Sequence, residues 1–173
     1  GSVNTSGNAM NATVFLNQGT IQLDASASIS NPNGPLGANN NKLYIGGNSI
    51  LNLNGNSLGV SALNTDGNYG TPGSLAAAAG LNAAVENMAA GTVSTLTVGV
   101  AAGPNSGITS AFYGGFVEGS GAILNLTVNS TTFTIGSVAT NINLGNAGGS
   151  QQQWSNNYQQ LTGSVTVNGG MPM

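Results

Sequence analysis

The sequence lacks the side chains on which most catalytic and zinc sites depend. It has no cysteine, no histidine and no arginine, and its single basic residue is Lys42. Histidine is the commonest general base, thiol chemistry needs cysteine, and structural zinc sites are built mainly from these two residues. The four acidic residues lie in four separate parts of the chain, which disfavours a paired-carboxylate hydrolase. We therefore expect no enzyme activity, no metal and no cofactor.

Charge of either sign is also scarce. Only 3% of the residues are charged, whereas an ordinary globular protein has about 25%. Nucleic acids and acidic lipids are bound by clustered lysine and arginine, so we expect no nucleic-acid partner. A single lysine leaves a trypsin-like protease one cleavage site, which suits a chain exposed to a harsh external medium.

Long apolar runs are absent as well. The longest, "LAAAAG", is far shorter than the roughly 20 residues of a membrane-spanning helix. We expect no membrane span in the mature chain. The expected location is extracellular, at the cell surface, after secretion and removal of a signal peptide.

What the sequence has in abundance is alternation of apolar and polar residues. Period-2 alternation is typical of antiparallel sheets that expose one face to water. No exact internal repeat is visible, so a solenoid is not expected. The predicted fold is mainly β: an antiparallel β-sandwich of jelly-roll or immunoglobulin-like type, forming one domain over residues 17–173. The alternating segments are "TIQLDAS", "KLYIGGNSILNLN", "VSTLTVGVA", "AILNLTVN", "TTFTIGSV" and "QLTGSVTVN".

One segment departs from this alternation. "PGSLAAAAGLNAAVENMAAG" is rich in alanine, the best helix former, and Leu81, Val85 and Met88 recur at helical spacing. Ser74 can cap its start and Gly91 can end it. The pattern predicts a single helix at about 74–90.

Four Asn-X-Ser/Thr signals mark candidate glycosylation sites, at Asn4, Asn11, Asn125 and Asn129. Asn125 falls on the predicted polar face of a strand, and Asn129 falls at the following turn. A glycan could be accommodated at both places.

Two aromatic residues, Trp154 and Tyr158, lie among amides in the predicted loop "NAGGSQQQWSNNYQQ". They can cover an edge of the core. Because tryptophan and tyrosine are enriched at interfaces, they can also form a subunit contact or a sugar platform.

Two further patterns have simpler interpretations. "NTDGNYG" spaces the oxygens of Asn64, Asp66 and Asn68 as calcium loops do, but Leu75 stands where the bidentate glutamate would be. A turn on Asp-Gly is the favoured interpretation. Lys42 could form an isopeptide bond with an asparagine, although a solvated lysine at the start of a strand is the favoured alternative.

A sheet protein with so little charge lacks the usual protection of its strand edges, which relies on lysine and other charges. Such edges pair with other chains, and an extended segment of one subunit can complete the sheet of the next. The N-terminal extension, residues 1–16, contains the uncharged alternating stretch "NAMNATVFLN". It is a candidate donor strand. The alternative is a hairpin at Asn17-Gln18-Gly19 that pairs Val14–Leu16 with Ile21–Leu23 of the same subunit.

The chain resembles subunits of archaeal extracellular β-sheet filaments of the thread and bundling-pilus type, which are distantly similar to TasA/camelysin biofilm fibres. The likeness lies in the charge-poor Asn/Ser/Thr/Gly composition, the signals "NTS", "NAT", "NLT" and "NST", the N-terminal strand and one Ala-rich helix. The resemblance implies a β-sandwich whose N-terminal donor strand fills a groove of the neighbouring subunit. The donor residues it implies are Val3, Met10, Ala12, Val14 and Leu16.

We therefore expect a structural subunit of an extracellular filament, a glycoprotein that polymerises with identical subunits by donor-strand exchange. It would serve adhesion or biofilm formation and contact neighbouring filaments or cell surfaces. One alternative is a monomeric or tip adhesin, or a carbohydrate- or ice-binding module, suggested by the threonine pairs Thr95/Thr97 and Thr132/Thr134. Another is a virion structural protein, which would also assemble from identical subunits.

Overall fold

The structure is a computed structural model and describes residues 13–24, 26, 33–34, 36–38, 41–46, 49–66, 83–99, 110–112, 114–129, 133–137, 140–141 and 161–168. In these ranges the regular elements are all strands. In chain order they are β1 (Thr13–Leu16), β2 (Gly19–Gln22), β3 (Asn33–Gly34), β4 (Gly37–Ala38), β5 (Lys42–Gly46), β6 (Ser49–Asn52), β7 (Leu58–Val60), β8 (Ala62–Asp66), β9 (Ala84–Asn87), β10 (Val93–Val98), β11 (Ser110–Phe112), β12 (Gly115–Glu118), β13 (Ile123–Val128), β14 (Phe133–Ser137), β15 (Thr140–Asn141) and β16 (Val165–Val167).

The strands form three parallel sheets. One has the order β1-β5-β8, the second β2-β6-β9-β12 and the third β7-β10-β13-β16. Strand β11 lies beside β8 and pairs in parallel with β14. Only two short pairs of the described strands, β3 with β4 and β14 with β15, are antiparallel.

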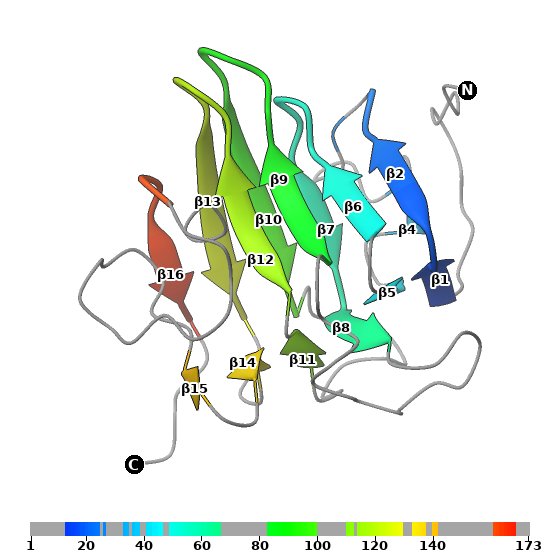
Figure 1. Cartoon of the computed structure of the whole chain (residues 1–173). Coiled ribbons are helices and arrows are strands. Elements are labelled where there is room, and N and C mark those ends of the chain that lie inside the picture. The colour runs from blue at the N-terminus through cyan, green and yellow to red at the C-terminus, as the bar shows by residue number, and fades with distance from the viewer. Residues whose placement is uncertain are drawn as a thin grey trace.

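The chain visits these sheets in a fixed order. It passes through β5, β6 and β7, then β8, β9 and β10, then β11, β12 and β13, and each passage stacks on the one before it (Figure 1). This is a parallel β-helix, in which each coil stacks its strands on those of the coil before it. The predicted antiparallel sandwich is therefore wrong, and so is the expectation that the chain would not form a solenoid.

Rows of apolar side chains fill the interior of the β-helix. The third sheet supplies a row of leucines and a valine, and beside it a row of valines, because residues in register lie one above another. The second sheet supplies a row that ends in Phe116, the largest side chain of the row. The three rows are Leu58, Leu96, Leu126 and Val165; Val60, Val98, Val128 and Val167; and Ile21, Leu51, Val85 and Phe116.

Most of the predicted inward faces that the structure describes are buried, although Val165 and Val167 are exposed and the predicted pairing is wrong. Leu43 and Ile45, for example, lie in the buried core as the alternation of their segment indicates. Alternation indicates that one face of a strand is buried and that the other face is exposed to water. The outward face of a β-helix meets water just as the outward face of a sandwich does, so both folds produce the same pattern.

The predicted helix at 74–90 is contradicted where the structure describes it. Residues 84–87 form the strand β9, whose side chains are mostly buried between β6 and β12. Val85 faces the core and is in register with Leu51 and Phe116. Helix propensity is a weak preference, and neighbouring strands on both sides override it. Residues 74–82 lie outside the described residues.

The turns between the second and third sheets also stack from coil to coil. Gly91 and Gly121 adopt φ values of 73° and 71°, which favour glycine, and the Gly91 N–H donates to the Gly121 carbonyl at 2.9 Å. The backbone hydrogen-bond ladder therefore continues through the corner of the β-helix.

Candidate functional site

The acidic residues that the structure describes do not gather into a group of metal ligands. Within the ranges that the structure covers, no cluster of three or more potential ligands among Asp, Glu, Cys and His is close enough to hold a metal ion. The calcium-like pattern is split: Asn64 and Asp66 belong to β8, and Asn68 lies outside the described residues. Lys42 is the first residue of β5, as its favoured interpretation predicted. Among the described residues no helix is long and apolar enough to cross a membrane.

Polar side chains instead occupy the corner that follows the second sheet. Asn87 is fully buried there, and its Oδ1 accepts the Gly55 N–H of the preceding coil at 2.9 Å. Its Nδ2 donates to the Ile123 carbonyl of the next coil at 2.9 Å. A buried backbone N–H without a partner is costly, so this asparagine satisfies groups that the turns leave unpaired.

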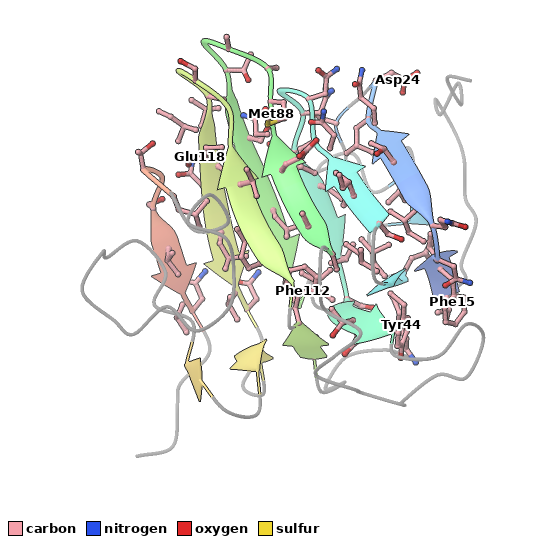
Figure 2. All side chains as sticks on the ribbon, in the orientation of Figure 1. Phe15, Asp24, Tyr44, Met88, Phe112 and Glu118 are labelled. Atoms are coloured by element: carbon pink, nitrogen blue, oxygen red, sulfur yellow. The ribbon has the colours of Figure 1, made fainter. Side chains whose placement is uncertain are left out.

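Glu118 occupies the position in register with Asn87, one coil later. Its Oε1 accepts the N–H groups of Leu124 at 2.6 Å and Gly163 at 3.2 Å. Its Oε2 accepts the N–H and the hydroxyl of Thr162 at 2.7 and 2.8 Å. One carboxylate thus holds the start of the last described segment, residues 161–168, which we call the C-terminal segment. Figure 2 shows Glu118 on the side of the molecule where β16 lies.

Replacing Glu118 with glutamine should loosen this segment. The amide group would turn two donor hydrogens toward backbone N–H donors, and hydrogen bonds to a charged group are each worth about 1.5–3 kcal/mol. We expect the free energy of unfolding to fall by about that amount in urea titrations at neutral pH. The amides of Thr162 and Gly163 should exchange faster. Unchanged exchange at these two amides would contradict the assigned role.

Two of the four glycosylation candidates lie on β13 or directly after it. Asn125 is half-buried, and its Oδ1 accepts the N–H of Ser164 at 2.8 Å and the Ser164 hydroxyl at 3.1 Å. The Oδ1 of Asn129 accepts from Asn168 Nδ2 at 2.8 Å. These hydrogen bonds use the carboxamide oxygen, whereas a glycan is attached to the nitrogen, so glycosylation of both residues stays a prediction.

The remaining site candidates lie outside the described residues. They are the glycosylation candidates Asn4 and Asn11, the donor-strand candidates Val3, Met10 and Ala12, and the interface candidates Trp154 and Tyr158. Their predicted roles remain predictions.

Val14 and Leu16, the last two donor-strand candidates, belong to β1. This strand pairs in parallel with β5 of the same chain, with Val14 opposite Leu43 and Leu16 opposite Ile45. The alternative hairpin is not formed, because β1 and β2 belong to different sheets. The expected domain boundary after residue 16 falls in the turn between these two strands, inside the β-helix. Figure 2 shows the ring of Phe15 beside that of Tyr44, and the two are stacked with centroids 5.0 Å apart.

The outward face of the third sheet carries a row of threonines. Thr97, Thr127 and Thr166 are in register on β10, β13 and β16. Beside them runs a second polar row of Thr95, Asn125 and Ser164. Neither row contains a charged residue, and the three hydroxyls of the first row make no hydrogen bond to another described residue. The threonine pair Thr95/Thr97 noted in the sequence therefore belongs to a larger face, whereas Thr132 lies outside the described residues.

Glu86 is a further acid that the structure places in a sheet. It lies on β9 in register with Asn52 and Val117. Partial burial removes water from its carboxylate and raises the pKa of Glu86 above its ordinary value.

Replacing Glu86 with glutamine should therefore stabilise the protein at neutral pH. The folded state holds the Glu86 proton more tightly than the unfolded state does. The wild-type protein therefore loses stability as the pH rises from about 4.3, the ordinary glutamate pKa, through the raised pKa of Glu86 in the folded state. Glutamine removes this loss. The melting temperature of Glu86→Gln should exceed that of the wild-type at pH 7, and the difference should shrink near pH 3. A difference that grew on acidification would contradict this sign.

Sequence reasoning missed Asn87 and Glu118, the two residues that organise the corner. Asn87 is the last residue of the strand "AVEN" in one coil, and Glu118 is the last residue of the strand "GFVE" in the next. Each is followed by a turn that contains glycine. This local similarity was the available signal. It indicates nothing about which backbone groups the side chains meet, because those come from other coils.

Comparison with known families, with curated proteins and with solved structures gives no match to this chain, so its role has to be argued from its own geometry.

Proposed function

We propose that the chain is a structural subunit of an extracellular filament, which assembles from identical subunits and serves adhesion or biofilm formation. The observation that carries this proposal is an uncharged edge strand at each end of the β-helix; Glu118, on the edge strand β12, is occupied by hydrogen bonds to the C-terminal segment. Strand β2 ends the second sheet and β16 ends the third, and neither contains a charged residue. Soluble proteins usually protect such strand edges with lysine, other charges or proline.

The direction of the strands supports the same proposal. A parallel β-helix presents different surfaces at its two ends, so the end of one copy can meet the start of the next. A head-to-tail contact of this kind is heterologous, and it produces an open filament when its rotation does not close a ring. The weak charge of the whole chain also removes the repulsion that keeps ordinary monomers apart.

Sedimentation and negative-stain microscopy test this function directly. We expect species well above the 16.9 kDa monomer, visible as filaments. Thr166→Lys adds a charge to the edge strand β16 and should shift the protein toward the monomer. The matched control Thr97→Lys lies in the same row but on β10, between two strands, and should still form filaments. A protein that stays monomeric at every concentration refutes the proposal.

A second candidate function is a monomeric module that binds ice or a crystalline polysaccharide. It is favoured by the row of Thr97, Thr127 and Thr166, whose hydroxyls repeat at the strand spacing of about 4.7–4.9 Å on an uncharged face. Its test is co-sedimentation with ice or with cellulose and chitin, compared between the wild-type and Thr97→Lys. Equal binding by the two proteins would argue against a role for this face.

A further inference from the structure

The C-terminal segment is attached to the outside of the last complete coil. Its strand β16 pairs only with β13 among the described strands. Val165 and Val167 continue the inward rows of Leu126 and Val128, yet their side chains are 40% and 56% exposed. Leu161 is the one described residue of the segment that lies in the buried core. Little apolar surface therefore holds the segment in place.

Specific hydrogen bonds hold it instead, and they come from one surface. We call this surface the socket: the edge of β13 together with the side chains of Glu118, Asn125 and Asn129. Thr162 and Gly163 donate to Glu118, Ser164 donates to Asn125, and Asn168 donates to Asn129. The backbone adds a bond from Leu126 N–H to the Ser164 carbonyl at 2.9 Å and one from Asn168 N–H to the Val128 carbonyl at 2.8 Å. The segment can leave without breaking any recorded hydrogen bond between earlier coils.

The N-terminal strand β1 is attached in a different way. Leu16 is only 6% exposed and belongs to the core, and Val14 packs against the core. The stacked rings of Phe15 and Tyr44 join β1 to β5 on the outward face. Removing β1 would expose core side chains, whereas removing β16 would expose much less new apolar surface.

We propose that the C-terminal segment is the strand exchanged between subunits, so that in the filament residues 161–168 of one copy occupy the socket of the next. This inference rests on the proposed self-assembly and names the element that performs it. The hydrogen bonds are the same within one chain and between two, which is the condition for domain swapping at low cost in free energy.

The length of chain before the segment permits the exchange. Residues 142–160 separate β15 from Leu161. An extended chain spans about 3.3–3.6 Å per residue, and adjacent strands are about 4.7–4.9 Å apart, so this connection is long enough to reach a neighbouring copy. The sequence of β16 also suits a socket on any copy, because Ser164-Val165-Thr166-Val167 repeats the pattern of Asn125-Leu126-Thr127-Val128.

Because the chain has no cysteine of its own, engineered cysteines can form disulfides only with each other. Thr127 and Thr166 are register partners on β13 and β16, and parallel neighbours lie within the Cα separation of about 4.4–6.8 Å that a disulfide needs. The double variant Thr127→Cys/Thr166→Cys is assembled, oxidised and run on a non-reducing gel. Exchange predicts a ladder of covalent species at multiples of the 16.9 kDa chain. The matched control Thr97→Cys/Thr127→Cys joins β10 to β13 and should give only monomers with an internal disulfide.

The outcomes separate the two proposals. Filaments that yield only internally cross-linked monomers from Thr127→Cys/Thr166→Cys would overturn strand exchange and leave the filament function standing. The absence of filaments together with the absence of the ladder would overturn both. Mixing the two single variants, Thr127→Cys and Thr166→Cys, gives an independent check, because a heterodimeric disulfide requires one chain's β16 to lie on the other chain's β13.

Discussion

Replacing Phe116 with alanine should lower the free energy of unfolding by about 3–5 kcal/mol, the range measured when a buried aromatic side chain is truncated. Phe116 is 1% exposed and ends the inward row that contains Leu51 and Val85. Its ring also meets that of Phe112, with centroids 5.2 Å apart and an angle of 57° between the planes. The parallel backbone ladder fixes the spacing of the row, so the neighbours cannot move in to fill the cavity.

Urea denaturation followed by far-ultraviolet circular dichroism measures this loss. The matched control is Val117→Ala, the next residue on β12, whose side chain is half-buried on the outward face. We expect the control to lose less than about 1 kcal/mol, because most of the removed surface is already in contact with water. Similar losses in the two variants would mean that Phe116 does not occupy a rigid core.

Alternation in the sequence predicted most of the inward faces but could not predict the partners of the strands. The segment "KLYIGGNSILNLN" looks like two strands joined by a turn, and it contains both β5 and β6. The two strands do not pair with each other, because the turn carries the chain from one sheet to the next. A period of two residues reports which face is buried, and it carries no information on whether the neighbour is the adjacent hairpin arm or the next coil.

A repeat was nevertheless present in the sequence. The third sheet is built from four similar tetrapeptides, "SLGV", "TLTV", "NLTV" and "SVTV", which begin at Ser57, Thr95, Asn125 and Ser164. A search for a fixed period misses them, because the connections between coils differ in length. Their shared pattern follows from the fold: the second and fourth residues face inward and are buried in the first three tetrapeptides, while the first and third residues face outward.

The asparagine content has a structural explanation that composition could not supply. Asn87 connects three coils from inside a corner, and Asn125 and Asn129 each bind the coil that follows. An asparagine carries both donors and acceptors, so it can satisfy the backbone groups that turns leave unpaired. From the sequence, Asn125 and Asn129 are interpreted as glycosylation candidates, and Asn87 falls inside the predicted helix at about 74–90.

Replacing Gly163 with alanine should detach the C-terminal segment while the earlier coils stay folded. A Cβ at this position would lie 2.6 Å from the Leu124 carbonyl carbon and 2.8 Å from Asn125 Oδ1, and closer still to the Leu124 carbonyl oxygen. The obstacle is backbone, so the segment has to move away and lose hydrogen bonds to Glu118 and Asn125. The bond to the charged Glu118 is worth about 1.5–3 kcal/mol and the bond to the neutral Asn125 about 0.5–1.5 kcal/mol, so we expect a loss of about 2–4.5 kcal/mol in docking free energy.

Hydrogen exchange locates this loss, because the amide of Leu126 donates to the Ser164 carbonyl and is exposed only when the segment leaves. Its protection should fall strongly in Gly163→Ala, while that of Val85 is retained. The control Gly91→Ala has no atom within 4 Å of the new Cβ, so it carries only the φ strain of about 1–2 kcal/mol and should leave Leu126 protected. If β16 is the exchanged strand, Gly163→Ala also abolishes filaments, since the same clash arises in the socket of a neighbour. Filaments formed by a Gly163→Ala protein with an unprotected Leu126 amide would show that assembly uses another surface.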